Sequence, residues 1–418
     1  MIRAKTTLPL IAAGLLAAAT LSACGSDNTD APKAGGASES APADAKSADP
    51  SLDPVVIGFR GLEGGTLSLT DMRKGFESAV DYVNSERGGI NGHPLKVVTC
   101  KTDVTPESSV NCANKFVGER VVMATQGVDY ATDAALPILQ KAGIVDTSGF
   151  AYGPLENTAV GDAYVAYASN EEGYAAGVVQ LAKMGAKSMA MVLADVPPLH
   201  TAMDKVIVPA AERLGVKVTP FFFSSPTDWT SFGATVLASD PNAIAFYGVD
   251  ADCIAAVPAF RSLGFSGIIQ AGTCAVMADK FKPSELTDVI VGNSIYNASM
   301  APIPDDVQAD IHIFERYTKD DGIENRGQAM QGFLTGTWVA DLLSQVKGDL
   351  TAASVKSAMK TAKGRLFFRT TGYDCSKPSW PGTTACSTGF FFTKVNDAGK
   401  SEVLPGQPVD VSGILPSS

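Results

Sequence analysis

The 418-residue sequence has few of the side chains on which catalysis and metal binding depend. Its three histidines are His93, His200 and His312, and none belongs to an H-E-x-x-H metal motif. It contains no G-x-S-x-G nucleophile motif and no phosphate-binding P-loop. Asp195 lies close enough to His200 in sequence to form an acid–base pair, but no nucleophile accompanies them in a recognisable motif. We therefore predict that the protein is not an enzyme and has no catalytic residue, metal or cofactor.

Positive charge is also scarce. The chain has 33 Lys and Arg against 44 Asp and Glu, so its formal net charge is −11. A nucleic-acid-binding protein needs a basic surface to displace the counterions of the phosphate backbone. This charge balance predicts no nucleic-acid partner.

The N-terminal apolar stretch, residues 8–19, follows two basic residues and is too short for a membrane-spanning helix. It leads into Leu21-Ser22-Ala23-Cys24, which has the pattern of a bacterial lipobox. In that pattern small residues admit a peptidase, and the thiol of the new N-terminus takes a lipid. The alternative is an ordinary signal peptide with an incidental cysteine. We expect a signal peptide at residues 1–24 and acyl chains on Cys24 that hold the mature protein outside the cytoplasmic membrane.

Residues 25–52 have almost no large apolar side chain and consist mostly of Ala, Ser, Gly, Pro and Asp. Such a segment cannot bury enough surface to offset the entropy of ordering it. We expect a disordered tether here, with the folded body beginning at Asp53.

Apart from Cys24 the chain has six cysteines, an even number that indicates disulfides in an exported protein. They fall into three couples that are local in sequence. We expect the disulfides Cys100–Cys112, Cys253–Cys274 and Cys375–Cys386. A metal site would need C-x-x-C or histidine partners at ligand spacing, and neither occurs.

The body is long enough for two lobes, and its short apolar strands alternate with amphipathic helices. In the first half, a strand at 55–59 precedes a helix near Ser68, where Ser68-Leu69-Thr70-Asp71 fits a capping box. The further elements expected there are strand 95–99, helix 108–117, strand 121–125, helix 133–142 and strand 144–147. The alternation restarts at Glu171, with a helix to 184, strand 188–193, helix 202–214, strand 217–222, helix 230–238, strand 243–247, helix 253–263 and strand 267–271. Two such units predict an α/β protein with two doubly wound parallel-sheet lobes that bind a ligand at the carboxyl ends of their strands.

Several segments occur in the order and spacing of a known family. They are Asp71-Met72-Arg73-Lys74-Gly75 with Ala79-Val80 and Asn84, then Gly88-Gly89-Ile90-Asn91-Gly92, Asn114-Lys115, residues 135–143 and Phe260-Arg261-Ser262-Leu263-Gly264. From about residue 55 to 395 the sequence resembles the type I solute-binding proteins of ABC importers, and among them the branched-chain amino acid (leucine-binding protein-like) group.

The resemblance implies two lobes joined by three crossovers, which form a three-stranded hinge. The first lobe would hold residues 53–170 and 298–362, and the second residues 171–297 and 363–418. It also implies a lipid-anchored monomer that captures a small organic solute by closing its lobes and delivers it to a membrane permease. The alternative is a tethered sensor that presents its solute to a membrane receptor.

The family's binding loops, carried over to this sequence, give the candidate ligand contacts. They are Ser68, Leu69, Thr70, Gly127, Asp129, Tyr130, Ser169, Asn170, Tyr174, Asp195, Tyr247 and Asp250. Several have a structural alternative, because Ser68 and Asp250 are good helix caps and Tyr130 and Tyr174 could pack between lobes.

The sequence departs from the amino-acid binders of this family at two places. Gly127-Val128-Asp129-Tyr130 replaces a glycine followed by small hydroxyl residues, and a dehydrated, anionic Asp129 would repel a solute carboxylate. Asp195 begins a segment that lacks the family's D-x-x-Y-G signature. The expected solutes are therefore a branched-chain amino acid or a related neutral or cationic compound, such as an amide, an amine or an aromatic molecule.

Overall fold

The computed structural model describes residues 45–64, 68–272, 274, 276–379 and 382–415. The predicted signal peptide, Cys24 and most of the predicted tether lie outside these residues. Among the residues described, no helix combines the length and the apolar character needed to cross a membrane.

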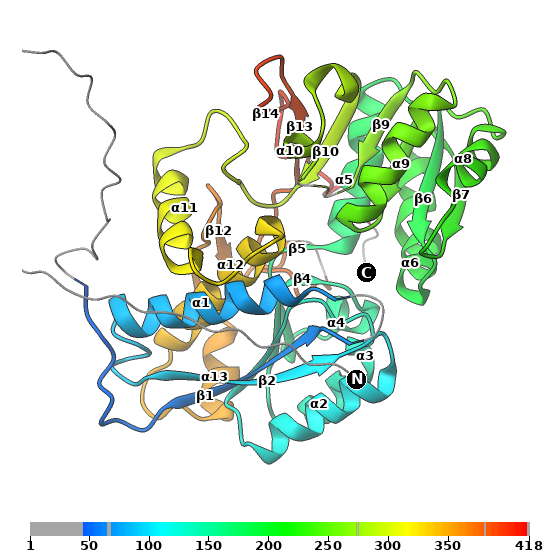
Figure 1. Ribbon diagram of the computed structural model, residues 1–418. Helices are drawn as coiled ribbons and strands as arrows, with labels where there is room; N and C mark the ends of the chain where they lie inside the picture. The colour runs from blue at the N-terminus through cyan, green and yellow to red at the C-terminus, as the bar shows by residue number, and fades with distance from the viewer. Residues whose placement is uncertain (1–44, 65–67, 273, 275, 380–381, 416–418) are drawn as a thin grey trace, which may run out of the picture. The chain divides into compact units, whose positions relative to one another are not determined.

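The first sheet has five parallel strands in the order β2-β1-β3-β4-β5 (Figure 1). The strands are β1 (Val55–Leu62), β2 (Leu95–Thr102), β3 (Met123–Gln126), β4 (Asp146–Ala151) and β5 (Ala163–Ser169). The helices between them are α1 (Thr70–Glu86), α2 (Pro106–Gly118), α3 (Thr132–Lys141) and α4 (Pro154–Thr158). The strands read as apolar runs because helices cover a parallel sheet and bury its side chains.

The second sheet has the order β14-β13-β10-β9-β8-β6-β7, and among these strands only β13 runs antiparallel to its neighbours (Figure 1). Its strands are β6 (Ser188–Ala194), β7 (Lys217–Phe223), β8 (Ala243–Tyr247), β9 (Ile268–Ala271), β10 (Val289–Asn293), β13 (Phe391–Val395) and β14 (Ser401–Val403). Its helices are α5 (Asn170–Lys183), α6 (Pro197–Ala202), a π-helical turn (Met203–Ile207), α7 (Val208–Arg213), α8 (Trp229–Leu237), α9 (Asp250–Ser262), α10 (Met277–Lys280) and a 3-10 turn (Pro283–Leu286). Two units with parallel sheets confirm the predicted fold class.

Three later helices follow β10, and the longest of them packs against α1. They are α11 (Asp305–Thr318), α12 (Arg326–Ser344) and α13 (Ala352–Met359). A Cβ atom placed on Gly75 of α1 would lie 1.9 Å from the carbonyl oxygen of Ala329, and one on Gly332 of α12 would lie 1.8 Å from that of Met72. Glycine is therefore required where the two helix backbones touch.

The hairpin of β11 (Lys363–Arg365) and β12 (Gly372–Asp374) also belongs with α12. Tyr373 donates a hydrogen bond of 2.5 Å to Asp341 of α12, and Ala385 pairs with Val165 of β5. The lobe boundary at residue 362 stays a prediction. We propose that the chain returns to the second sheet at about residues 387–390.

The three predicted disulfides are present, with Cα–Cα distances of 5.6 Å for Cys100–Cys112, 6.4 Å for Cys253–Cys274 and 4.3 Å for Cys375–Cys386. The predicted capping box at Ser68 does not form. The residue before α1 is Leu69, and the Ser68 hydroxyl instead lies 3.0 Å from that of Thr70. The helix begins without a side-chain cap, so this part of the prediction is wrong.

Candidate functional site

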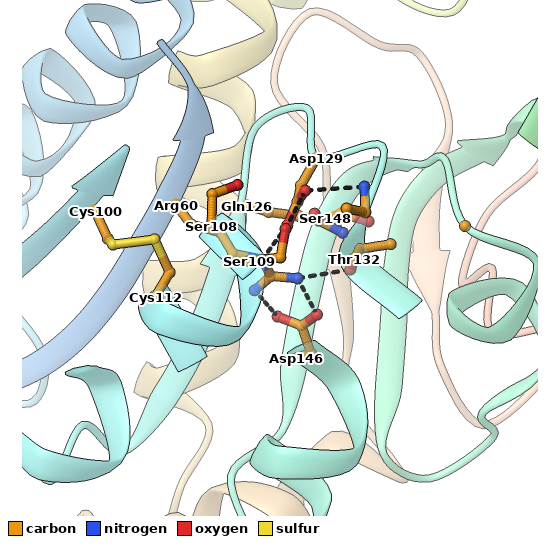
Figure 2. A network of polar contacts seen from close by, with 12 residues as sticks. Arg60, Cys100, Ser108, Ser109, Cys112, Gln126, Asp129, Thr132, Asp146 and Ser148 are labelled. Carbon is orange, nitrogen blue, oxygen red and sulfur yellow. Dashed lines mark hydrogen bonds and ion pairs between the residues drawn. A yellow bond between two sulfur atoms is a disulfide. The ribbon is translucent and has the colours of Figure 1, made fainter. Parts of the chain in front are cut away.

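A buried ion network joins the carboxyl ends of β1 and β3 to Asp146, the first residue of β4 (Figure 2). The Arg60 side chain, fully buried near the end of β1, donates through Nε to Asp129 at 2.9 Å and through both terminal nitrogens to Asp146 at 2.8 and 2.6 Å. Thr132 accepts a further bond of 2.7 Å. Burial alone would lower the pKa of Arg60, but the charges of Asp146 and Asp129 outweigh it and raise the pKa above its ordinary value.

Asp129 is used inside this network. It accepts hydrogen bonds from the Ser109 hydroxyl at 2.7 Å and from the amide of Ala131 at 3.1 Å, in addition to the Arg60 ion pair. The charge of Asp129 would repel a solute carboxylate strongly only as an unpaired anion. Arg60 pairs with this charge, and the role of Asp129 as a ligand contact stays a prediction.

Glu156, also fully buried, continues the network behind β4. Its Oε1 accepts from Gln126 at 2.6 Å and Ser148 at 2.5 Å, and its Oε2 accepts from the amide of Tyr152 at 3.1 Å. Burial and the negative charge of Asp146 raise the pKa of Glu156 to about 7. Glu156 therefore holds the segment after β4 in place. Its carboxyl group is mostly protonated below neutral pH.

Aromatic side chains gather at the same end of the first sheet. Tyr130 and Tyr152 meet edge to face with ring centroids 5.4 Å apart, and both pack on an apolar cluster that includes Leu69 and Met72. Burial and the charge of Asp252, at the start of α9, raise the pKa of Tyr130 to about 12. Tyr152 was not predicted, although its position after β4 is a strand-end signal of the kind used for the other loops.

A second pair of rings comes from the second unit. Tyr174 of α5 and Tyr247 at the end of β8 meet edge to face at 4.8 Å, and the Tyr247 hydroxyl donates to the carbonyl oxygen of Gly173 at 3.4 Å. Burial, with smaller contributions from Tyr130 and Tyr247, raises the pKa of Tyr174 well above its usual value. The influence of Tyr130 on Tyr174 means that predicted residues from both units lie near one another.

Asp250 makes a direct contact between the two units. It is the first residue of α9, and its Oδ2 accepts a hydrogen bond from the side-chain amide of Asn325, the residue before α12. Burial raises the pKa of Asp250, opposed by this bond. Val249, rather than Asp250, precedes the helix, so the simple capping alternative for Asp250 does not apply.

Asn325 is a contact that the sequence analysis missed. Its Oδ1 accepts from the amide of Gln328 at 3.0 Å and so caps α12, while Asp71 of α1 accepts the amides of Glu324 and Asn325 at 2.9 and 2.7 Å. Asn-x-x-Gln before an apolar helix is a recognisable cap signal. Nothing local shows that the free amide nitrogen reaches Asp250.

Of the remaining predicted residues, some are buried and one, Asp195, is exposed. Ser169 caps α5 by accepting from the amide of Glu172 at 3.2 Å, and both it and Asn170 are buried where the chain enters the second unit. Gly127 packs against Met72 after β3. Asp195, by contrast, is half-exposed, and its side chain pairs with His200 at 2.7 Å.

Comparison with known proteins supports the fold and identifies the family. The family model described as "Periplasmic binding protein" matches residues 55–400. A comparison with curated protein sequences finds no match.

Three solved structures share the fold. The branched-chain amino acid transporter substrate-binding protein LivJ from Streptococcus pneumoniae, in complex with isoleucine, has a TM-score of 0.67 at 17% identity and covers 85% of this chain and 100% of its own. A fatty acid ABC transporter substrate-binding protein from Thermomonospora curvata has a TM-score of 0.70 at 14% identity, over 89% and 98%. A possible leucine/isoleucine/valine-binding protein from Rhodopirellula baltica has a TM-score of 0.69 at 16% identity, over 88% and 98%.

Proteins of this family are solute-binding proteins that act outside the cytoplasmic membrane, and they are not enzymes. The two parallel-sheet units, and the match over most of the chain, together show that this chain belongs to the periplasmic binding protein family.

Proposed function

We propose that this protein is the lipid-anchored solute-binding component of an ABC importer. It captures a small organic solute between its two lobes and delivers it to the permease. The lipobox ending at Cys24 supports the anchor, and the family and the structural neighbours support the importer role.

The observation that carries the proposal is the contact between Asp250 and Asn325. It joins a helix that follows β8 to a helix that packs on the first sheet, at the place where Tyr130, Tyr174 and Tyr247 gather. A solute bound among these groups touches both lobes at once. It therefore stabilises the closed arrangement over the open one, which is the only way in which a ligand can shift such an equilibrium.

The solute that suits these groups has an amine, amide or aromatic character. The tyrosine rings offer apolar faces that also attract cations, and Asp250 offers a carboxylate that accepts N–H bonds. Arg60 is not available to a solute anion, because its guanidinium is buried and bound by Asp129 and Asp146. Branched-chain amino acids remain candidates, since the charge of Asp129 is already paired with Arg60.

A thermal-shift screen of residues 45–418 tests the proposal, using branched-chain amino acids, amides, polyamines and aromatic amines as probes. A ligand at 100 times its Kd adds about 2.7 kcal/mol, which corresponds to about 3–4 °C in a body of this size. For any compound that raises the melting temperature, Asp250→Asn should increase the Kd at least tenfold. Asp305→Asn is the matched control, because Asp305 also begins a helix but is exposed.

Two results would contradict the proposal. A screen without any shift would remove the support for small organic solutes of these classes. Equal affinities in the Asp250 and Asp305 variants would show that the binding site lies elsewhere.

A further inference from the structure

Three segments connect the two sheets, and the side chain of Arg369 contacts all of them. β5 leads directly into α5, β10 is followed by the segment before α11, and the third connection precedes β13. The Arg369 guanidinium lies 5.5 Å from the ring centre of Tyr167 in β5. It donates to the carbonyl oxygen of Ser294 after β10, and to that of Thr388 before β13 at 2.6 Å. A change in the angle between the lobes must therefore rearrange the contacts of this side chain.

Glu172, in the first turn of α5, accepts hydrogen bonds from the backbone of the third connection. Its Oε1 accepts from the amides of Gly389 at 2.9 Å and Phe390 at 3.4 Å. Glu172 is 0% exposed and Arg369 is 3% exposed. An acid and a base thus lie buried at the point where the three connections meet.

Among the residues that the structure describes, each of these two groups has one polar atom without a hydrogen-bond partner. The atoms are Oε2 of Glu172 and Nε of Arg369. The two side chains attract each other electrostatically but form no direct ion pair here. Buried polar atoms are nearly always paired, because an unpaired one has lost its water and gained nothing in return. An Nε–H to Oε2 bond would satisfy both atoms at once.

A small pocket lies beside this junction, next to the second connection. Its volume is about 30 Å³, close to that of one water molecule. It is lined by Ser294 and its neighbours after β10, and by Gly327, Met330 and Gln331 at the start of α12. Ser294, whose carbonyl oxygen accepts from Arg369, is therefore a lining residue of this pocket.

We propose that Glu172 and Arg369 form a hinge switch, in which they are held apart in the lobe arrangement described here and form a direct ion pair in the second arrangement, which admits the solute. This inference goes beyond the proposed function, and it does not depend on which solute is bound.

The switch is coupled to protons. Burial raises the pKa of Glu172 to about 7 and lowers that of Arg369 to about 10, so the present arrangement favours a neutral Glu172 beside a charged Arg369. The other titratable groups facing Arg369 are Tyr167 and Tyr296, which remain neutral in this range. Direct pairing with Arg369 favours the ionised acid. The ratio of the paired to the present arrangement should therefore rise by up to about tenfold per pH unit between pH 5 and 7, and level off above pH 7.

Distance measurements between spin labels on residues 45–418 test the switch without added solute. Non-canonical amino acids at Asn111 of α2 and Ala234 of α8 carry the labels, because both sites are exposed and the disulfides are left intact. We expect two distance populations whose ratio changes between pH 5.5 and 8.5. Glu172→Gln cannot ionise, so it should favour the present arrangement and remove most of this pH dependence.

Glu156→Gln is the matched control, because Glu156 is equally buried, its pKa is also raised to about 7, and its carboxyl group is bound by Gln126, Ser148 and the amide of Tyr152 rather than by the three connections. It should leave the pH dependence of the distances unchanged. A single population that does not change with pH in the unsubstituted protein would overturn the proposal, and this measurement needs no variant to fold. Equal effects of the two substitutions would overturn it as well, since the response would then be a general effect of buried acids.

Discussion

Substitution of Glu156 by Gln should change the pH dependence of stability in a defined direction. The wild-type carboxyl group is fully buried among Gln126, Ser148 and the amide of Tyr152, and its pKa is raised to about 7 from the 4.5 of an exposed glutamate. Because the folded state holds the proton more tightly than the unfolded state, this group contributes stability that is fully present below about pH 4.5. That contribution falls as the pH rises and is lost once the pH passes through about 7.

The magnitude follows from the difference between the two pKa values. A rise from 4.5 to about 7 corresponds to about 3 kcal/mol, and Gln, which has no proton to lose, does not show this decline. The variant carries its own penalty at every pH, because its NH2 group would face amide donors where the Glu156 Oε2 atom accepts from Tyr152 and Gly153. This penalty shifts the whole curve and leaves its slope unchanged.

Urea unfolding of both proteins from pH 4.5 to 8.5 measures the effect. The free energy of unfolding of the variant, relative to the wild type, should rise by about 3 kcal/mol across this range, most of it between pH 4.5 and 7. A difference that stays flat would refute the reasoning, whatever its absolute value. A difference that falls with pH would mean that the folded state binds the ionised form of Glu156 better.

Two further substitutions test the packing and the ion network. Gly75→Ala should cost at least about 3 kcal/mol in thermal unfolding, because its Cβ would overlap the backbone of α12. Gly118→Ala, with open space at the end of α2, should leave stability unchanged or raise it by up to about 1 kcal/mol. Equal effects of the two substitutions would contradict the helix contact. Arg60→Met leaves two buried carboxylates without their cation and should lower the free energy of unfolding by about 3–5 kcal/mol. Stability should recover in part when Asp129 and Asp146 are also changed to Asn. An Arg60→Met variant as stable as the wild type would show that the network does not stabilise the fold.

The order of strands and helices could be predicted because its signals are local. Runs such as Ala243–Tyr247 are apolar and include β-branched and aromatic residues, and the expected strand coincides with β8. The disulfides were also predictable, since each joins cysteines that are close in sequence. The failed cap at Ser68 shows the limit of such signals. A capping pattern does not determine whether its hydroxyl will bind the first amides of the helix or another side chain.

The amino-acid sequence by itself determined the fold class, the cysteine pairs and the loops at which a site could form, because apolar periodicity and short loop closure depend on neighbouring residues. Only the tertiary structure decided what those loops contain. Arg60 meets Asp129 across 69 positions, Asn325 reaches Asp250 across 75, and Arg369 joins three connections that are far apart in the chain. Such pairings depend on where the packed helices and sheets place each side chain, and on the need to satisfy every buried charge, which no local pattern records.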